Sequence, residues 1–253
     1  MTAEEQPAHA ELRAWQQQMQ RRPSLLNRLT RQVQIQLNAL LPERVHQALT
    51  AAIRQMVRGV LFGSTYTTRR PLTGATLVAR ETAVRTRIRY YRNTAAAEGA
   101  VTGAGGFLLG LADFPLLMGI KIKLLFDIAA LYGHDGRDYA ERLYLLHVFQ
   151  LAFSSQHTRN ETYQRLANWE TYRHSLPPDV NEFDWRTFQQ EYRDYIDLAK
   201  LAQLLPIIGA PVGAIANYQL LNRLGVTAMN CYRLRYFAAA PPPAAPADRS
   251  SPG

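Results

Sequence analysis

Four polar residues stand in or beside the two longest apolar stretches of the sequence and are candidates for chemistry: Glu98, Asp113, Lys200 and Asn217. Glu98 and Asp113 bracket a glycine-rich segment and could form the carboxyl pair that acid/base catalysis uses. Structural roles compete with this hypothesis, because Asp113 can cap the helix that follows and Glu98 can pair with a preceding arginine. Convergence of all four residues on one pocket would indicate a hydrolase-like enzyme.

Lys200 is the sharper candidate among these residues. Lysine occurs only at positions 121, 123 and 200, and Lys200 opens the second apolar stretch. A buried charge needs a partner of opposite sign. We therefore predict an ion pair between Asp113 and Lys200 that joins the two apolar stretches.

The other reactive side chains form no recognised catalytic or metal-binding motif. The six histidines, at positions 9, 46, 134, 147, 157 and 174, include no HExxH motif and no i,i+4 pair. The sequence also lacks the Gly-x-Ser-x-Gly elbow and the Gly-Lys-Ser/Thr phosphate loop. His147 and Cys231 are predicted to pack in the core. We expect no cofactor and no metal, and the sequence favours a protein without enzymatic activity.

The elements that must position the four candidates are two apolar stretches of twenty-two residues, 99–120 and 201–222, in which Asp113 is the one charged residue. Gly and Pro interrupt both stretches, so they predict two helical hairpins and disfavour simple spanning helices. Hairpins of this kind either pack in the core or dip into one leaflet of a membrane. The glycines expected to allow close backbone packing are Gly99, Gly103, Gly105, Gly106, Gly110, Gly209 and Gly213.

The remaining periodicity predicts an all-α fold in a single multi-helix domain, because apolar residues recur at helical spacing and no segment alternates. Helices are expected from residue 24, from residue 184, and over 42–61, 75–97, 115–132, 138–153, 160–172 and 211–237. Gly133 is expected to end the helix over 115–132. The predicted organisation is an N-terminal helical or flexible arm (1–22), a helical domain (23–237) and a disordered Ala/Pro tail (238–253).

Positive charge is concentrated in the first part of the chain. Residues 1–97 hold fifteen Arg and five Glu, a net charge of +10, whereas the whole chain carries +9. Arg85, Arg89 and Arg92 fall on one face of the predicted helix over 75–97. Such a face attracts anionic lipid headgroups or nucleic-acid phosphates, and it can also be a solvated surface with no dedicated partner.

An ordered set of short motifs resembles the EcsC family over about residues 23–237. The set begins with Leu41-Pro42-Glu43-Arg44-Val45-His46 and continues through Glu98-Gly99-Ala100, Thr102-Gly103, Gly105-Gly106-Phe107, Ala112-Asp113, Pro115 and Tyr132-Gly133. It closes with Lys200, Leu205-Pro206-Ile207-Ile208-Gly209-Ala210, Gly213-Ala214, Asn217, Ala228 and residues 233–237. That family is named for a protein encoded beside an ABC transporter, so the resemblance implies a helical protein in a bacterial cell-envelope context. It supplies no catalytic residues.

These observations favour a non-enzymatic, membrane-peripheral helical protein that binds anionic lipid or a membrane partner such as a transporter. A homo-oligomer is a further option. The acidic N-terminus lacks a signal-peptide pattern and the chain has one cysteine, so we expect a cytoplasmic protein, peripheral to the inner face of the cytoplasmic membrane. Two alternatives stay open: the hydrolase-like pocket around Glu98, Asp113, Lys200 and Asn217, and a nucleic-acid-binding module that uses the arginine face.

Overall fold

The computed structural model describes residues 2–21, 51, 55, 57–62, 70–104, 106–154, 156–177 and 210–239. The labelled elements of these ranges are all helices, which confirms the all-α prediction. They are the 3-10 helix η1 (Ala3–Glu5) and the α-helices α1 (Gln6–Gln20), α4 (Leu77–Ala104), α5 (Gly106–Leu131), α6 (Tyr139–Phe153), α7 (Gln156–Ala167), α8 (Trp169–His174) and α11 (Ala210–Ala239).

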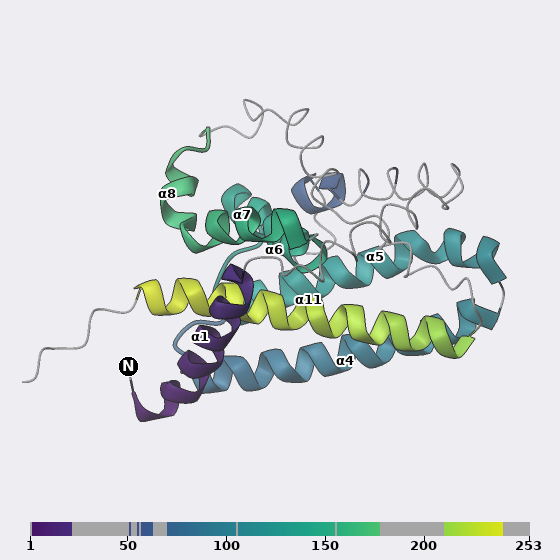
Figure 1. Cartoon of the computed structure of the whole chain (residues 1–253), viewed down its shortest axis with the longest axis horizontal. Helices are drawn as coiled ribbons and strands as arrows, with labels where there is room; N and C mark the ends of the chain where they lie inside the picture. Colours follow the sequence, from purple (N-terminus) through teal and green to yellow (C-terminus); the bar gives the residue numbers. More distant parts are fainter. Residues whose placement is uncertain are drawn as a thin grey trace, which may run out of the picture.

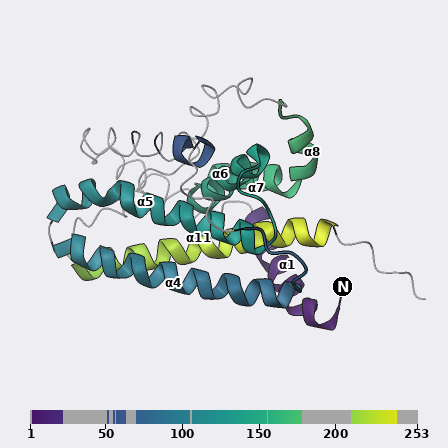
Figure 2. The same ribbon diagram turned by 180° about the vertical axis from the view of Figure 1, so that it is seen from behind.

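Three long helices, α4, α5 and α11, lie side by side and form the body of the molecule (Figures 1 and 2). α4 runs antiparallel to both α5 and α11. The end of α4 at Ala104 and the starts of α5 at Gly106 and α11 at Ala210 therefore lie at one end of this bundle, which we call the tip. At the opposite end, which we call the base, α1 crosses the bundle and α6, α7 and α8 cover it.

The predicted apolar face of α4 is the face that the structure buries. Leu77, Val84, Ile88 and Tyr91 are each at most 9% exposed. α4 is longer than the predicted 75–97 helix and continues to Ala104. α5 likewise begins at Gly106 instead of Pro115, so the proline lies within a helix and does not start one. A helix can contain a proline if it gives up one backbone hydrogen bond. Pro115 is such a case, and for this reason the predicted start of the helix at this residue is wrong.

The end of α5 agrees with the prediction that Gly133 terminates it. Gly133 has φ of +93°, a left-handed conformation that glycine adopts without strain. A Cβ atom added at Gly133 would come within 2.8 Å of the Arg80 guanidinium. Arg80 Nη1 donates a hydrogen bond of 3.1 Å to the Leu131 carbonyl oxygen, which α5 leaves without an intrahelical donor. The glycine thus makes room for a side chain that caps the helix end.

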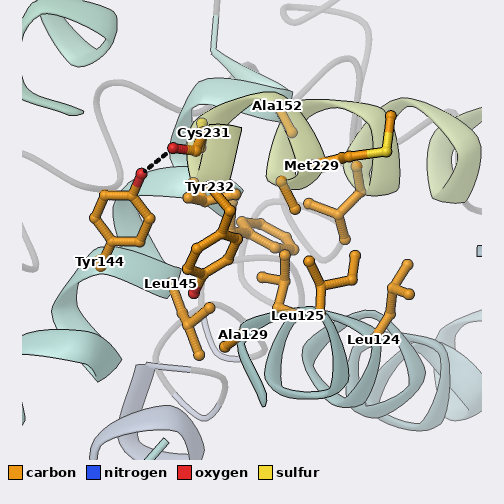
Figure 3. Close-up of a cluster of buried hydrophobic side chains, with 14 of the residues drawn as sticks. Leu124, Leu125, Ala129, Tyr144, Leu145, Ala152, Met229, Cys231 and Tyr232 are labelled. Atoms are coloured by element: carbon orange, nitrogen blue, oxygen red, sulfur yellow. Dashed lines mark hydrogen bonds between the residues drawn. The ribbon is translucent and has the colours of Figure 1, made fainter. Parts of the chain in front are cut away.

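Helix α6 is almost entirely buried, and its side chains meet those of α5 and α11 in one apolar cluster (Figure 3). Asp138, the first residue of the predicted helix over 138–153, lies just before α6 and caps its N-terminus by accepting a hydrogen bond of 2.9 Å from the Ala140 amide. The Tyr144 hydroxyl donates a hydrogen bond of 2.7 Å to the Cys231 carbonyl oxygen of α11. Cys231 and His147 are both fully buried, which confirms that they belong to the core.

Helix α1 belongs to the same packed unit. Its buried side chains Ala8, Leu12, Trp15 and Met19 lie at helical spacing, and the helix contacts α11 and α7. The Trp15 ring meets the Tyr163 ring of α7 edge to face at 5.7 Å. The predicted helix over 160–172 is instead two helices, α7 and α8, which are separated at Asn168.

Helices α4 and α11 approach each other closely at Gly225. A Cβ atom at this position would lie 2.6 to 3.0 Å from three side-chain carbons of Ile88. These distances are far below ordinary van der Waals contact. Glycine is therefore required here by the opposing helix and not by its own backbone conformation.

We predict that Gly225→Ala will destabilise the protein. Overpacking at this contact should cost about 1–3 kcal/mol, which exceeds the gain of about 1 kcal/mol from better helix propensity. In an Ile88→Ala background the clash is absent, so the same Gly225→Ala change should be neutral or stabilising. Urea unfolding of the four proteins measures both effects. An equal effect of Gly225→Ala in the two backgrounds would contradict the close contact.

Candidate functional site

Only one of the four polar candidates has a described side chain. Glu98 and Asp113 lie on α4 and α5, but their side chains are outside the described part, and so is all of Lys200. The predicted Asp113–Lys200 pair and the four-residue pocket therefore remain predictions. The packing glycines at 99, 103, 106, 110 and 213 lie on α4, α5 and α11, whereas Gly105 and Gly209 are outside the described residues.

Asn217 lies on α11 near the tip and is buried, with 1% of its surface exposed. Neither its Nδ2 nor its Oδ1 atom has a hydrogen-bond partner among the described residues. A second asparagine of α11, Asn230, is equally buried but donates to the Val226 carbonyl oxygen at 3.0 Å and accepts from Arg233 at 3.0 Å. Asn217 is thus the unusual one, because buried amides are nearly always hydrogen-bonded.

The three arginines of the predicted basic face differ in their surroundings. Arg85 Nη2 lies 3.1 Å from a Glu11 carboxylate oxygen and 3.6 Å from Glu81. Arg92 donates to the Asn222 side chain at 3.1 Å and its guanidinium stacks 4.2 Å from the Tyr218 ring centre. Within the described residues, neither Arg89 nor Arg92 has a carboxylate partner. The positive charge of Arg85 is therefore neutralised within the fold, whereas that of Arg89 and Arg92 is not.

A buried ionic cluster at the base joins three helices. Arg233 of α11, whose side chain is 0% exposed, donates to both carboxylate oxygens of Glu81 on α4 at 2.6 and 2.7 Å. Arg233 Nη2 also lies 2.8 Å from the carboxylate of Glu11 on α1. Partial burial raises the pKa of Glu11, but Arg233 and Arg85 outweigh it, so that this pKa lies below its ordinary value. Every group of the cluster has an opposite charge beside it.

A second cluster lies nearby between α6 and α11. Glu141 accepts hydrogen bonds from the Tyr232 hydroxyl and, at 2.7 Å, from Arg235. The His134 ring stacks on Tyr232 at 5.2 Å, and its Nδ1 lies 3.6 Å from Glu141. Burial, assisted by the charges of Arg235 and Arg80, lowers the pKa of His134 to about 3. His134 is therefore neutral at physiological pH.

These clusters were not predicted from the sequence. Arg233, Glu81 and Glu141 lie on the buried faces of their helices, and a charged residue in register with a helix's buried apolar residues is the signal that could have identified them. Their partners lie as many as 152 residues away along the chain, however, so only the fold identifies the pairs. Each charge in the two clusters is paired with an opposite charge inside the protein. This arrangement favours a role in holding the helices in place over a role in catalysis.

Several large apolar side chains are exposed toward the tip. Leu116 of α5 is 57% exposed, Ile215 of α11 is 58% exposed and Tyr218 of α11 is 37% exposed. Tyr90 of α4, beside Arg89, is 58% exposed. Large apolar side chains thus stand in water on all three helices, close to the two arginines without carboxylate partners.

Neither a metal centre nor a membrane span is found in the described residues. No group of three or more His, Cys, Asp or Glu side chains there could hold a metal ion. Over the same ranges, no helix has both the length and the apolar character needed to cross a bilayer.

Comparisons with known proteins identify relatives over most of the chain. The model of the EcsC protein family matches residues 6–237, a range that includes α1. Protein EcsC of Bacillus subtilis (strain 168) is 45% identical over 222 residues, which are 87% of this chain and 91% of that protein. Uncharacterized protein YdbA of the same organism is 33% identical over 143 residues, which are 56% of this chain and 53% of YdbA. No solved structure matches the chain significantly.

We predict that Glu81→Ala will lower the free energy of unfolding by about 3–5 kcal/mol, because it removes the main counter-ion of the buried Arg233. Glu81→Ala combined with Arg233→Met should recover part of this loss, since no orphaned cation remains. Glu11→Ala should cost less, because Glu11 is half exposed. Urea unfolding of the wild type, Glu81→Ala, Arg233→Met, the double variant and Glu11→Ala tests these expectations. Strictly additive losses for Glu81 and Arg233 would show that the pair is not coupled.

We also predict that stability falls as the pH drops below about 6.5. The pKa of His134 is about 3 in the folded protein, against an ordinary value of 6.5, so the unfolded chain binds more protons between these two values. The contribution of His134 is complete above pH 6.5 and is lost progressively toward pH 3. His134→Phe keeps the ring stacking but removes the titration, and should make the decline in urea midpoint between pH 7 and pH 5 shallower. An unchanged slope would exclude His134 as a cause.

Proposed function

The chain belongs to the EcsC protein family, and we propose that it is a peripheral membrane protein that docks the tip of its α4–α5–α11 bundle on an anionic lipid surface. The observation that carries this proposal is the combination of exposed apolar side chains at the tip with arginines that have no carboxylate partner among the described residues. At the base, by contrast, Arg85, Arg233 and Arg235 are each paired with carboxylates.

Apolar residues supply the first part of the interaction. The tip-forming segments 99–112 and 210–222 contain no charged residue. Ile215 and Tyr218 within the second segment, and Leu116 just after the first, expose apolar surface. Removal of such surface from water is favourable by about 25 cal/mol per Å², so three large side chains contribute several kcal/mol when they enter the membrane interface.

Positively charged residues supply the second part of the interaction with the membrane and determine how the protein is oriented on it. Arg92 lies twelve residues before the end of α4, or about 18 Å along the helix axis. The hydrocarbon of one leaflet is about 15 Å thick. When the tip enters one leaflet, Arg92 and the neighbouring Arg89 therefore reach the level of the phosphates. Glu98 and Asp113, which are closer to the tip end, enter the hydrocarbon at this depth and must be neutralised or paired there. Each arginine near an anionic surface contributes about 1 kcal/mol, and Tyr90 and Tyr218 suit the same interfacial level.

We expect the purified protein to co-sediment with vesicles of phosphatidylglycerol and phosphatidylcholine and to bind pure phosphatidylcholine much more weakly. Leu116→Glu combined with Ile215→Glu should reduce binding at least about tenfold, because two apolar contacts become charged. Arg89→Gln should reduce it about fivefold, and Arg85→Gln less, because Arg85 is already paired with Glu11 and Glu81.

Val78→Glu is the matched control, because Val78 is 44% exposed on α4 but lies at the base. This variant should bind vesicles like the wild type. Equal losses from Val78→Glu and from the tip variants would contradict docking through the tip. Retention by cell membranes without binding to protein-free vesicles would replace lipid with a membrane protein, such as a transporter, as the partner.

A further inference from the structure

We infer that the tip half of the bundle opens at the membrane, and that Asn217 is the residue that keeps the closed tip weak enough to open. This inference rests on the proposed docking of the tip. It concerns a conformational change, however, and can be tested apart from docking itself.

In the closed tip, Asn217 is a buried amide whose hydrogen bonds are not satisfied by the described residues. Its side chain is almost completely buried, and within the described residues neither amide atom has a hydrogen-bond partner. Burial removes the amide from bulk water, and no described residue replaces those hydrogen bonds. A group in this state destabilises the conformation that buries it. Any motion that exposes Asn217 is favoured by the same amount.

The two halves of the bundle are held together by different contacts. The base is fixed by Arg233 with Glu81 and Glu11, and the close contact of Gly225 with Ile88 marks the upper limit of this region. Beyond it, Arg92 links α4 to α11 through Asn222 and Tyr218, and this arginine is partly exposed. Separation of the helices can therefore stop at Gly225 while the base remains packed.

Opening of the tip would bring buried apolar side chains into contact with lipid. Ala95 of α4, Leu117 of α5 and Leu221 of α11 are buried in the closed tip. Separation of the helices would move these apolar faces into lipid. Asn217 lies seven residues from the start of α11, about 10 Å along its axis. In an inserted tip it is then within about 5 Å of the headgroup boundary. There its amide can reach lipid ester and glycerol oxygens.

Hydrogen exchange of the full-length chain, followed by mass spectrometry, tests the opening directly. We expect amides of residues 210–222 to exchange at least about tenfold faster than those of residues 225–237. Asn217→Leu should slow exchange at 210–222 about tenfold, raise Tm by roughly 3 °C, and leave the base unchanged. It should also weaken binding to phosphatidylglycerol-containing vesicles, because fewer molecules reach the open state.

Two further variants keep the test decisive. Asn217→Ala removes the amide without adding volume and should change exchange in the same direction as Asn217→Leu. Asn230→Leu removes an amide that is hydrogen-bonded, and it should lower Tm and leave exchange at the tip no slower. Unfolding of both Asn217 variants would show that Asn217 stabilises the closed tip, and would overturn the inference.

The outcomes separate this inference from the proposed function. Slower exchange with unchanged vesicle binding would reject opening as a step in docking while leaving the docking itself intact. Unchanged exchange in both Asn217 variants would reject the role of Asn217. Failure of the wild-type protein to bind any vesicle would instead reject the proposed function, and with it the membrane as the trigger for opening.

Discussion

The pairing of the buried Arg233 with Glu81 is the interaction on which the arrangement of the helices depends. Two charges removed from water are tolerated only where each satisfies the other with good geometry. This requirement fixes the register of α11 against α4, because a shift of one turn would leave a bare guanidinium in the core. Glu11 extends the requirement to α1. The interaction therefore selects one alignment among the many that apolar surfaces alone would permit.

Given that alignment, the two ends of the bundle acquire opposite properties. Carboxylates gather at the base, where they neutralise Arg85, Arg233 and Arg235, while Arg89 and Arg92 lie toward the tip without such neighbours in the described structure. Apolar side chains are buried around α6 (Figure 3), whereas Leu116 and Ile215 toward the tip are more than half exposed. A molecule with this polarity would meet a charged surface in one orientation.

The sequence predicted the helices better than their contacts. Periodicity identified the buried face of α4, and Gly133 correctly marked the end of α5, because both signals are local. Pro115 gave a wrong helix start because a proline signals a break that the surrounding helix can absorb. Gly225 and Arg233 could not be predicted, since each owes its role to a residue more than one hundred positions away. Asn217 was identified as a candidate, but its lack of hydrogen bonds required the structure.

The pairing of α4 with α11 also affects how the chain folds. α11 follows all the other described helices in the sequence, yet α1 and α4 both pack against it. During synthesis, the apolar face of α4 therefore cannot pack against α11 until more than one hundred further residues have left the ribosome. Contacts between residues so far apart in the sequence slow folding. Until they form, the exposed apolar surface can associate with other chains. A chain that lacked α11 would expose these faces permanently and would be a substrate for chaperones and proteases.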